Sequence, residues 1–276
     1  MSSAIRIRFF VAGHCLMPGA AFAPDQAGRV EVPVYFTLIE HPQALVLFDT
    51  GGSSRVIQQA SRFPFVLTRS LFSLEMRPEH EAAYQLSEAG TAPTDVRLVI
   101  VSHFHPDHVG GLRDFPEAVF LYWRKSYDGI KSKGLLGRFR RGFMPELLPA
   151  DFEPRSRYLD GAIWVRLEPE FAPFDSGWDV FEDRTVFAVP LPGHAEGQVG
   201  LLVRAHDATY FLVADACYSS QAYRELVLPK GSAMRWLHHD PVKYAETLTK
   251  LHALHKKNPS IRIVPSHCAE ARHFWD

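Results

Sequence analysis

The chain has 276 residues, of which 46% are hydrophobic and 22% are charged, a composition typical of a folded globular protein. Its formal net charge of -1, with 14 histidines counted as neutral, argues against a general nucleic-acid-binding protein. The three cysteines are too few for a disulfide framework, and no apolar run reaches the roughly 18 residues of a membrane-spanning helix. The N-terminal residues also lack the uninterrupted apolar stretch of a signal peptide. We therefore expect a cytoplasmic protein with no membrane or nucleic-acid partner.

The first half of the chain predicts mainly strands. A loop rich in glycine and proline is expected over Gly13–Gly28, and the apolar residues of Arg62–Leu74 favour no single element. Val96–Val101 is a continuous β-branched run, which indicates a strand buried on both faces. The predicted strands are Ile5–Val11, Val30–Glu40, Ala44–Phe48, Val96–Val101 and Ala118–Tyr122, and the predicted helices are Ser53–Gln59 and Glu79–Ala89.

The second half predicts a helical segment, two hairpins, a long helix and a last strand. Arg124–Arg141 has helical tendency and carries seven basic residues against one acid, Asp128. The hairpins are expected at 180–189 and 198–213, the amphipathic helix at Pro241–His255 and the strand at Ile261–Val264. No repeat or linker divides the chain. The order of elements predicts a single α/β domain over residues 1–276, with two sheets between helical layers.

A cluster of ligand-type side chains follows the buried strand directly. His103 and His105 alternate by two, so an extended backbone points both side chains the same way. Asp107 and His108 come where the chain turns into a helix. Imidazole and carboxylate ligands together suit zinc, and iron, manganese or cobalt less often.

Three more candidate ligands stand at the ends of other predicted strands. His194 follows Leu191-Pro192-Gly193, Asp215 follows the strand at 209–213, and His267 follows the last strand. A lone His-x-His pair is usually accidental. The combination with three further strand ends predicts a metal site with seven ligands.

These residues resemble the metallo-β-lactamase superfamily over nearly the whole chain, which implies its four-layer αββα sandwich. The resemblance implies that His103, His105 and His194 hold one zinc ion. It implies that Asp107, His108 and His267 hold the second, and that Asp215 bridges both. Asp49, in Asp49-Thr50-Gly51, would orient a ligand or its loop, although a simple turn residue is an equal alternative.

Within the superfamily, the chain is most similar to the quorum-quenching N-acyl homoserine lactonases. Tyr218 stands three residues after Asp215, where a tyrosine of that family helps to polarise the lactone carbonyl. The resemblance implies that two zinc ions share a hydroxide that attacks the lactone, with Tyr218 stabilising the oxyanion and Asp107 passing a proton to the alkoxide. Phe104 and Met17 are weaker candidates for contacts with the substrate.

Two features depart from the family pattern and leave alternatives open. Pro106 replaces a bulkier apolar residue, and a helical insert at about 124–178 is expected to cover the active site. The basic run at 124–141 could instead bind an anionic substrate or simply be a solvated helix face. The alternatives are a thioesterase like glyoxalase II, a phosphodiester or phosphotriester hydrolase, and a non-catalytic sensor of a small molecule. A homodimer is expected by resemblance only.

Overall fold

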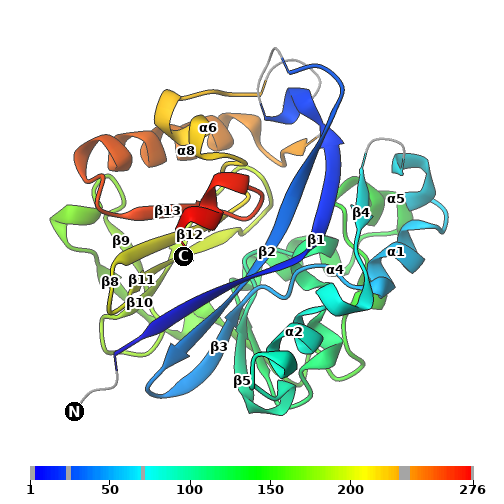
Figure 1. Cartoon of the computed structure of the whole chain (residues 1–276), viewed down its shortest axis with the longest axis horizontal. Coiled ribbons are helices and arrows are strands. Elements are labelled where there is room, and N and C mark those ends of the chain that lie inside the picture. The colour runs from blue at the N-terminus through cyan, green and yellow to red at the C-terminus, as the bar shows by residue number, and fades with distance from the viewer. Residues whose placement is uncertain (1–3, 23–25, 70–71, 230–236, 275–276) are drawn as a thin grey trace.

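The computed structural model describes residues 4–22, 26–69, 72–229 and 237–274. Figure 1 shows the described strands and α-helices, coloured in chain order from blue to red. The strands are β1 (Arg6–Pro18), β2 (Arg29–His41), β3 (Ala44–Phe48), β4 (Ser73–Glu75), β5 (Val96–Ile100), β6 (Val119–Tyr122), β7 (Ser156–Tyr158), β8 (Ile163–Arg166), β9 (Ser176–Asp179), β10 (Val186–Pro190), β11 (Val199–Arg204), β12 (Thr209–Ala214) and β13 (Arg262–Pro265). The α-helices are α1 (Ser54–Ala60), α2 (Ala82–Glu88), α3 (Pro106–Val109), α4 (Arg124–Lys131), α5 (Leu135–Arg140), α6 (Ser220–Glu225) and α8 (Pro241–Lys257).

Short 3₁₀ turns connect many of these elements. They are η1 (Gly19–Ala21), η2 (Phe65–Thr68), η3 (Pro78–His80), η4 (Pro93–Asp95), η5 (Leu112–Asp114), η6 (Pro145–Leu147), η7 (Leu159–Gly161), η8 (Pro169–Phe171) and η9 (Ala269–Phe274).

The described strands form two mixed sheets. The first sheet has seven strands in the order β4-β1-β2-β3-β5-β6-β7, and the second has six in the order β13-β12-β11-β10-β9-β8. Pairing is parallel from β3 through β7 and between β12 and β13, and antiparallel elsewhere. A parallel pair needs a crossover connection, which is why helices lie between these strands along the chain.

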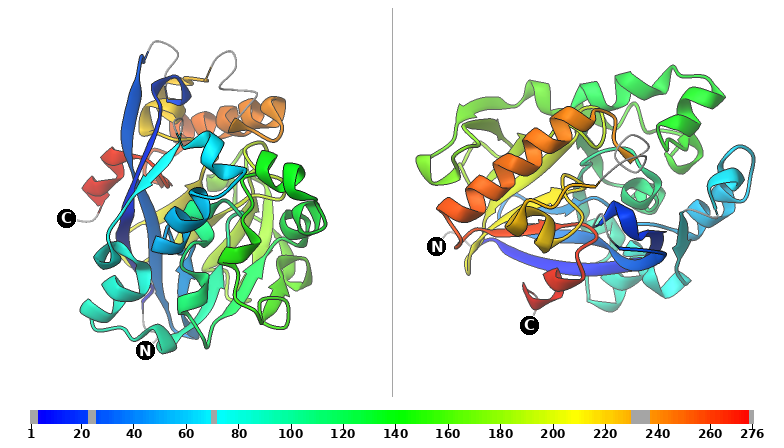
Figure 2. Two further views of the ribbon diagram at one scale, coloured as in Figure 1. Left: turned by 90° about the vertical axis from the view of Figure 1, so that its right-hand side faces the viewer. Right: turned by 90° about the horizontal axis from the view of Figure 1, so that it is seen from above.

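Three apolar clusters hold four layers together. Ile39 and Val46 of the first sheet pack with Leu201 and Leu212 of the second, so the middle core lies between the sheets. The outer face of the first sheet packs against α1, α2 and α4. The outer face of the second packs against α6 and α8. Figures 1 and 2 show the same order, with α6 and α8 on one side of the sheets and the other helices on the opposite side. The αββα architecture and the single domain predicted from the sequence are confirmed.

The prediction of a loop over Gly13–Gly28 is wrong for its first part. β1 continues through His14 to Pro18, after a change of register between Val11 and His14. Gly13 has a φ of +84°, and a Cβ there would lie 2.7 Å from the carbonyl of Glu75, so a glycine is needed where β4 approaches. Pairing with β2 and β4 on both sides outweighs the local turn preference of this stretch.

The segment at 124–178 is helical only in its first part, at α4 and α5. Beyond these helices it supplies β7 to the first sheet and β8 and most of β9 to the second. These strands are short and have little alternation, so their pairing comes from neighbours that are distant in sequence. The sequence also gave no clear signal for β4 or α6.

No helix in the described part of the chain combines the length and the apolar surface needed to cross a membrane. The cysteines Cys15, Cys217 and Cys268 are all free.

Packing of α8 on the second sheet offers a direct test of this layer. Leu248 is fully buried, whereas Val242 on the same helix is 68% exposed. We expect Leu248→Ala to lower the free energy of unfolding by about 2–5 kcal/mol, because it leaves a cavity between helix and sheet. The control Val242→Ala should change it by less than about 0.5 kcal/mol. Urea unfolding of the metal-loaded protein measures both values, and equal losses would contradict the packing described here.

Candidate metal centre

Seven polar side chains meet beyond the C-terminal ends of strands from both sheets. They come from the segments after β5, β10, β12 and β13 and from the short helix α3. They form two groups, and the ligand atoms within each group lie within 4.8 Å of one another. The first group is His103, His105, His194 and Asp215, and the second is Asp107, His108 and His267. The structure therefore brings together all seven residues singled out in the sequence.

Asp215 lies between the two groups and turns one oxygen toward each. Its Oδ2 is 3.3 Å from Nε2 of His194, while its Oδ1 is 3.2 Å from Nε2 of His108 and 3.4 Å from Nε2 of His267. Ala214, with a φ of 48°, turns the chain sharply at the end of β12. A carboxylate in this position can bind two cations at once.

Asp49 follows β3 and holds two of the histidines in one orientation. Its Oδ1 accepts from the Ser102 amide at 2.8 Å, and its Oδ2 accepts from the Ser102 hydroxyl at 2.7 Å. Nδ1 of His108 lies 2.7 Å from the same Oδ2, and Nδ1 of His103 lies 2.9 Å from Ser102 Oγ. The carboxylate only accepts, and the single Ser102 hydroxyl proton is donated to it, so both Nδ1 atoms carry protons. Each Nε2 is then the ring atom turned toward the centre and available to a cation.

Two other histidines are oriented in a similar way. Nδ1 of His267 donates to the Pro33 carbonyl at 2.9 Å, and Nδ1 of His194 lies 2.9 Å from the Tyr218 hydroxyl. His105 is turned the other way, since its Nδ1 lies 2.8 Å from Nε2 of His194. These contacts leave one nitrogen of each imidazole facing the centre.

The inward atoms fit a bound cation better than they fit each other. Nε2 of His103, Nε2 of His108 and Oδ1 of Asp215 are buried, yet none forms a well-directed hydrogen bond with a described residue. The short distance between His108 and Asp215 therefore brings the two atoms together without good geometry. Buried polar atoms without partners are costly, and a metal ion would satisfy several of them at once.

Burial and charge bias the ionisation of these groups. Burial lowers the pKa of His103 well below its ordinary value, and the neighbouring His108 acts in the same direction. Burial works to raise the pKa of Asp215, but the charges of His267 and His108 hold it well below its usual range. Burial works to lower the pKa of His267, but mainly Asp215 raises it to about 10. A cation that binds at His267 must therefore displace a proton.

The loop after β5 fits closely against the loop after β3. The Thr50 amide donates to the His108 carbonyl at 2.8 Å, and the Gly110 amide donates to the Gly51 carbonyl at 3.0 Å. A Cβ on Gly110 would lie 2.8 Å from backbone atoms of the other loop. Glycine is thus required here for close approach. Pro106 starts α3, a position where its missing amide proton costs nothing.

The two weaker substrate candidates lie in different surroundings. Met17 packs in a small apolar cluster with Val32 and Tyr218 beside the centre. Phe104 is only 3% exposed and packs edge-on against Tyr122 and Phe143 in the outer core. It lies between His103 and His105, so the extended backbone turns it away from the ligands. The structure therefore places Phe104 in the core and not in the site.

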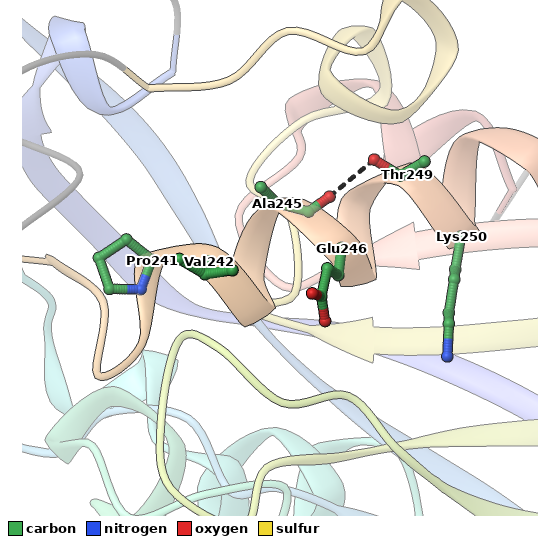
Figure 3. Close-up of a pocket in the computed structure, with 6 residues that line it drawn as sticks. All are labelled: Pro241, Val242, Ala245, Glu246, Thr249 and Lys250. Carbon is green, nitrogen blue, oxygen red and sulfur yellow. Dashed lines mark hydrogen bonds between the residues drawn. The ribbon is translucent and has the colours of Figure 1, made fainter.

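Residues after α5 border the centre. Gly142 has a φ of +60°, and a Cβ there would lie 3.0 Å from the His105 ring. A separate hollow of about 670 Å³ lies on the outer side of α8, shown in Figure 3. It is lined by Pro241, Val242, Ala245, Glu246, Thr249 and Lys250, and includes none of the seven side chains.

Asp49 provides a test of the centre that leaves the seven side chains intact. We expect Asp49→Asn to weaken metal binding by about 10–100-fold, because the amide places an NH2 donor where one carboxylate oxygen now accepts, facing either the Ser102 amide or the Ser102 hydroxyl and His108. Competition with a chromophoric chelator measures this affinity. The matched control is Asp179→Asn, a buried carboxylate that accepts from the Arg184 amide instead. Equal metal affinity in the wild type and Asp49→Asn would contradict the assigned role.

Comparisons with known proteins agree with this architecture. The model of the metallo-beta-lactamase superfamily matches residues 29–254. The N-acyl homoserine lactonase AttM of Azorhizobium caulinodans is 29% identical over 201 residues, covering 72% of this chain and 70% of AttM. The N-acyl homoserine lactonase AiiB of Agrobacterium fabrum is 26% identical, covering 80% and 75%.

A likeness to solved structures extends over nearly the full length. An N-acyl homoserine lactone hydrolase, solved with the product N-hexanoyl-L-homoserine bound at its catalytic metal centre, superposes with a TM-score of 0.76. The identity is 20%, and the match covers 99% of this chain and 97% of that one. The dizinc quorum-quenching lactonase AidC gives a TM-score of 0.66 at 15% identity, covering 96% and 88%. At these identities the likeness shows the shared fold.

Proposed function

The chain belongs to the metallo-beta-lactamase superfamily and is a metal-dependent hydrolase, and we propose that it opens the lactone ring of N-acyl homoserine lactones or similar lactones at a pair of zinc ions. The observation that carries this proposal is the position of Asp215, with one carboxylate oxygen toward each group of ligands. The similarity of the chain to N-acyl homoserine lactonases favours a lactone as the substrate.

His103, His105, His194 and Asp215 would hold one ion, and Asp107, His108 and His267 together with Asp215 would hold the other. When bound, such a pair of ions lowers the pKa of a coordinated water toward about 7 and polarises a carbonyl group. Iron, manganese or cobalt would fit the same ligands. The chain itself supplies orientation, hydrogen bonds and proton transfer.

Tyr218 is proposed to donate a hydrogen bond to the lactone carbonyl oxygen. If Nε2 of His194 binds a cation, its Nδ1 carries the proton and donates to the Tyr218 oxygen. The tyrosine O–H is then free to donate elsewhere, so the same side chain can orient His194 and stabilise negative charge on the substrate. Burial raises the pKa of Tyr218 well above its ordinary value, which keeps the hydroxyl protonated.

Asp107 is proposed to take up the proton that the attacking water loses on adding to the lactone carbonyl, and to pass it to the departing alkoxide. Its side chain is 21% exposed, whereas those of His108 and Asp215 are at most 5% exposed. A carboxylate that lies in the centre and is also partly exposed to solvent can exchange a proton with a bound substrate. Its Oδ2 lies 3.3 Å from Nε2 of His267, which holds the carboxylate in place.

A substrate panel tests the proposed reaction. We expect the zinc-loaded protein to open an N-acyl homoserine lactone faster than it hydrolyses S-lactoylglutathione or a phosphodiester. Asp215→Ala should abolish lactone opening, because neither ion would keep its shared ligand. Turnover of the phosphodiester alone would contradict the proposed substrate, and an active Asp215→Ala variant would contradict the dinuclear mechanism.

Removing the Tyr218 hydroxyl should slow the reaction without removing the metal. We expect Tyr218→Phe to lower kcat for the lactone by about 10²–10³-fold, the usual effect of losing one oxyanion donor. Tyr210→Phe is the matched control, since this buried tyrosine hydroxyl contacts Asp207, away from the centre. Steady-state kinetics and zinc analysis are measured together. An unchanged kcat in Tyr218→Phe with full zinc content would rule out the proposed role.

A further inference from the structure

His238 is a buried histidine beside the metal centre that belongs to neither group of ligands. It is 5% exposed, and its ring centroid lies 5.5 Å from that of His194. Its place in the sequence does not indicate a ligand, because it does not follow a predicted strand. Its position depends on contacts that only the folded chain makes.

The backbone around His238 is fixed to the loop that carries His194. The His239 amide donates to the His194 carbonyl at 2.8 Å, and the Asp240 amide donates to the Gly193 carbonyl at 2.9 Å. Asp240 also caps the start of α8 through its side chain. The main chain therefore holds His238 at a constant distance from the centre.

Tyr244 covers one face of the imidazole, and Tyr218 lies beside it. The ring of Tyr244 is stacked on His238 at 3.7 Å with an interplanar angle of 20°, and the ring of Tyr218 lies 5.9 Å away at 24°. Hydrogen bonds to an imidazole form in the plane of the ring, at the edge where its two nitrogens lie.

Neither ring nitrogen of His238 has a hydrogen-bond partner among the residues that the structure describes. His41 is equally buried, but its Nε2 contacts both Asp183 and Thr185. A buried donor or acceptor without a partner is costly, so this arrangement needs a compensating ligand. No carboxylate pairs with the ring in the described chain, and charging it there would be costly, so the ring suits a neutral polar partner.

We propose that His238 is a specificity-determining residue that hydrogen-bonds the amide group in the acyl arm of the substrate. The inference rests on the proposed lactonase function. A neutral imidazole offers one N–H donor and one acceptor, and an amide offers the complementary carbonyl and N–H. A site built to pair such a group discriminates against an analogue that lacks it, because its own buried polar atoms are then left unpaired.

The test compares two lactones in wild type and His238→Phe, which keeps the aromatic stack. One substrate is an N-acyl homoserine lactone, and the other is an α-alkyl-γ-butyrolactone of equal chain length in which methylene groups replace the amide. We expect His238→Phe to lower kcat/KM for the amide substrate by about 10–100-fold. The value for the alkyl lactone should change by less than about threefold.

Two further variants sharpen the result. His238→Gln keeps a donor and an acceptor and should restore most of the preference for the amide substrate. His41→Phe replaces a remote buried histidine and should leave the ratio between the two substrates unchanged. If both lactones are slowed equally in His238→Phe, including through loss of zinc, the inference is wrong while the lactonase function stands. A wild-type enzyme that opens neither lactone would overturn both.

Discussion

The hydrogen bonds accepted by Asp49 are the constraint on which the metal centre depends. One carboxylate accepts from His108 directly and fixes His103 through the Ser102 hydroxyl. It thereby sets the tautomer of two ligands and turns their lone pairs inward. The same residue connects the loop after β3 to the loop after β5. One carboxylate therefore both orients the ligands and holds the two loops together.

Turning the ligand atoms inward costs folding free energy, which the packing of the rest of the chain must offset. Several buried nitrogen and oxygen atoms face each other without good hydrogen bonds. The two sheets hold them there because their strands pack through an apolar core, and the Val199 amide of the second sheet donates to the Ser102 carbonyl beside the first. Metal binding should relieve this cost, so that the affinity for cations contributes to the stability of the folded chain.

Aromatic and imidazole side chains behind the ligand His194 extend from the centre toward α8. Tyr218 contacts His194 through its hydroxyl, and His238 stacks on Tyr244 with Tyr218 beside both rings. Gly193 makes this possible, because a Cβ there would lie 2.3 Å from the backbone of Tyr244. The side chain that orients the ligand His194 and the side chain proposed to select the substrate, Tyr218 and His238, thus lie on the same side of the site.

The fold class and the seven clustered side chains could be predicted from the sequence, because strand ends and the His103–His108 spacing are local features. The strands β7 and β8, the extension of β1 and the burial of Phe104 could not be predicted in this way, since they depend on partners distant in the chain. Tertiary structure also decided which nitrogen of each histidine faces inward and that His238 lies beside His194. Those outcomes are set by hydrogen bonds between loops, which leave no periodic pattern in the sequence.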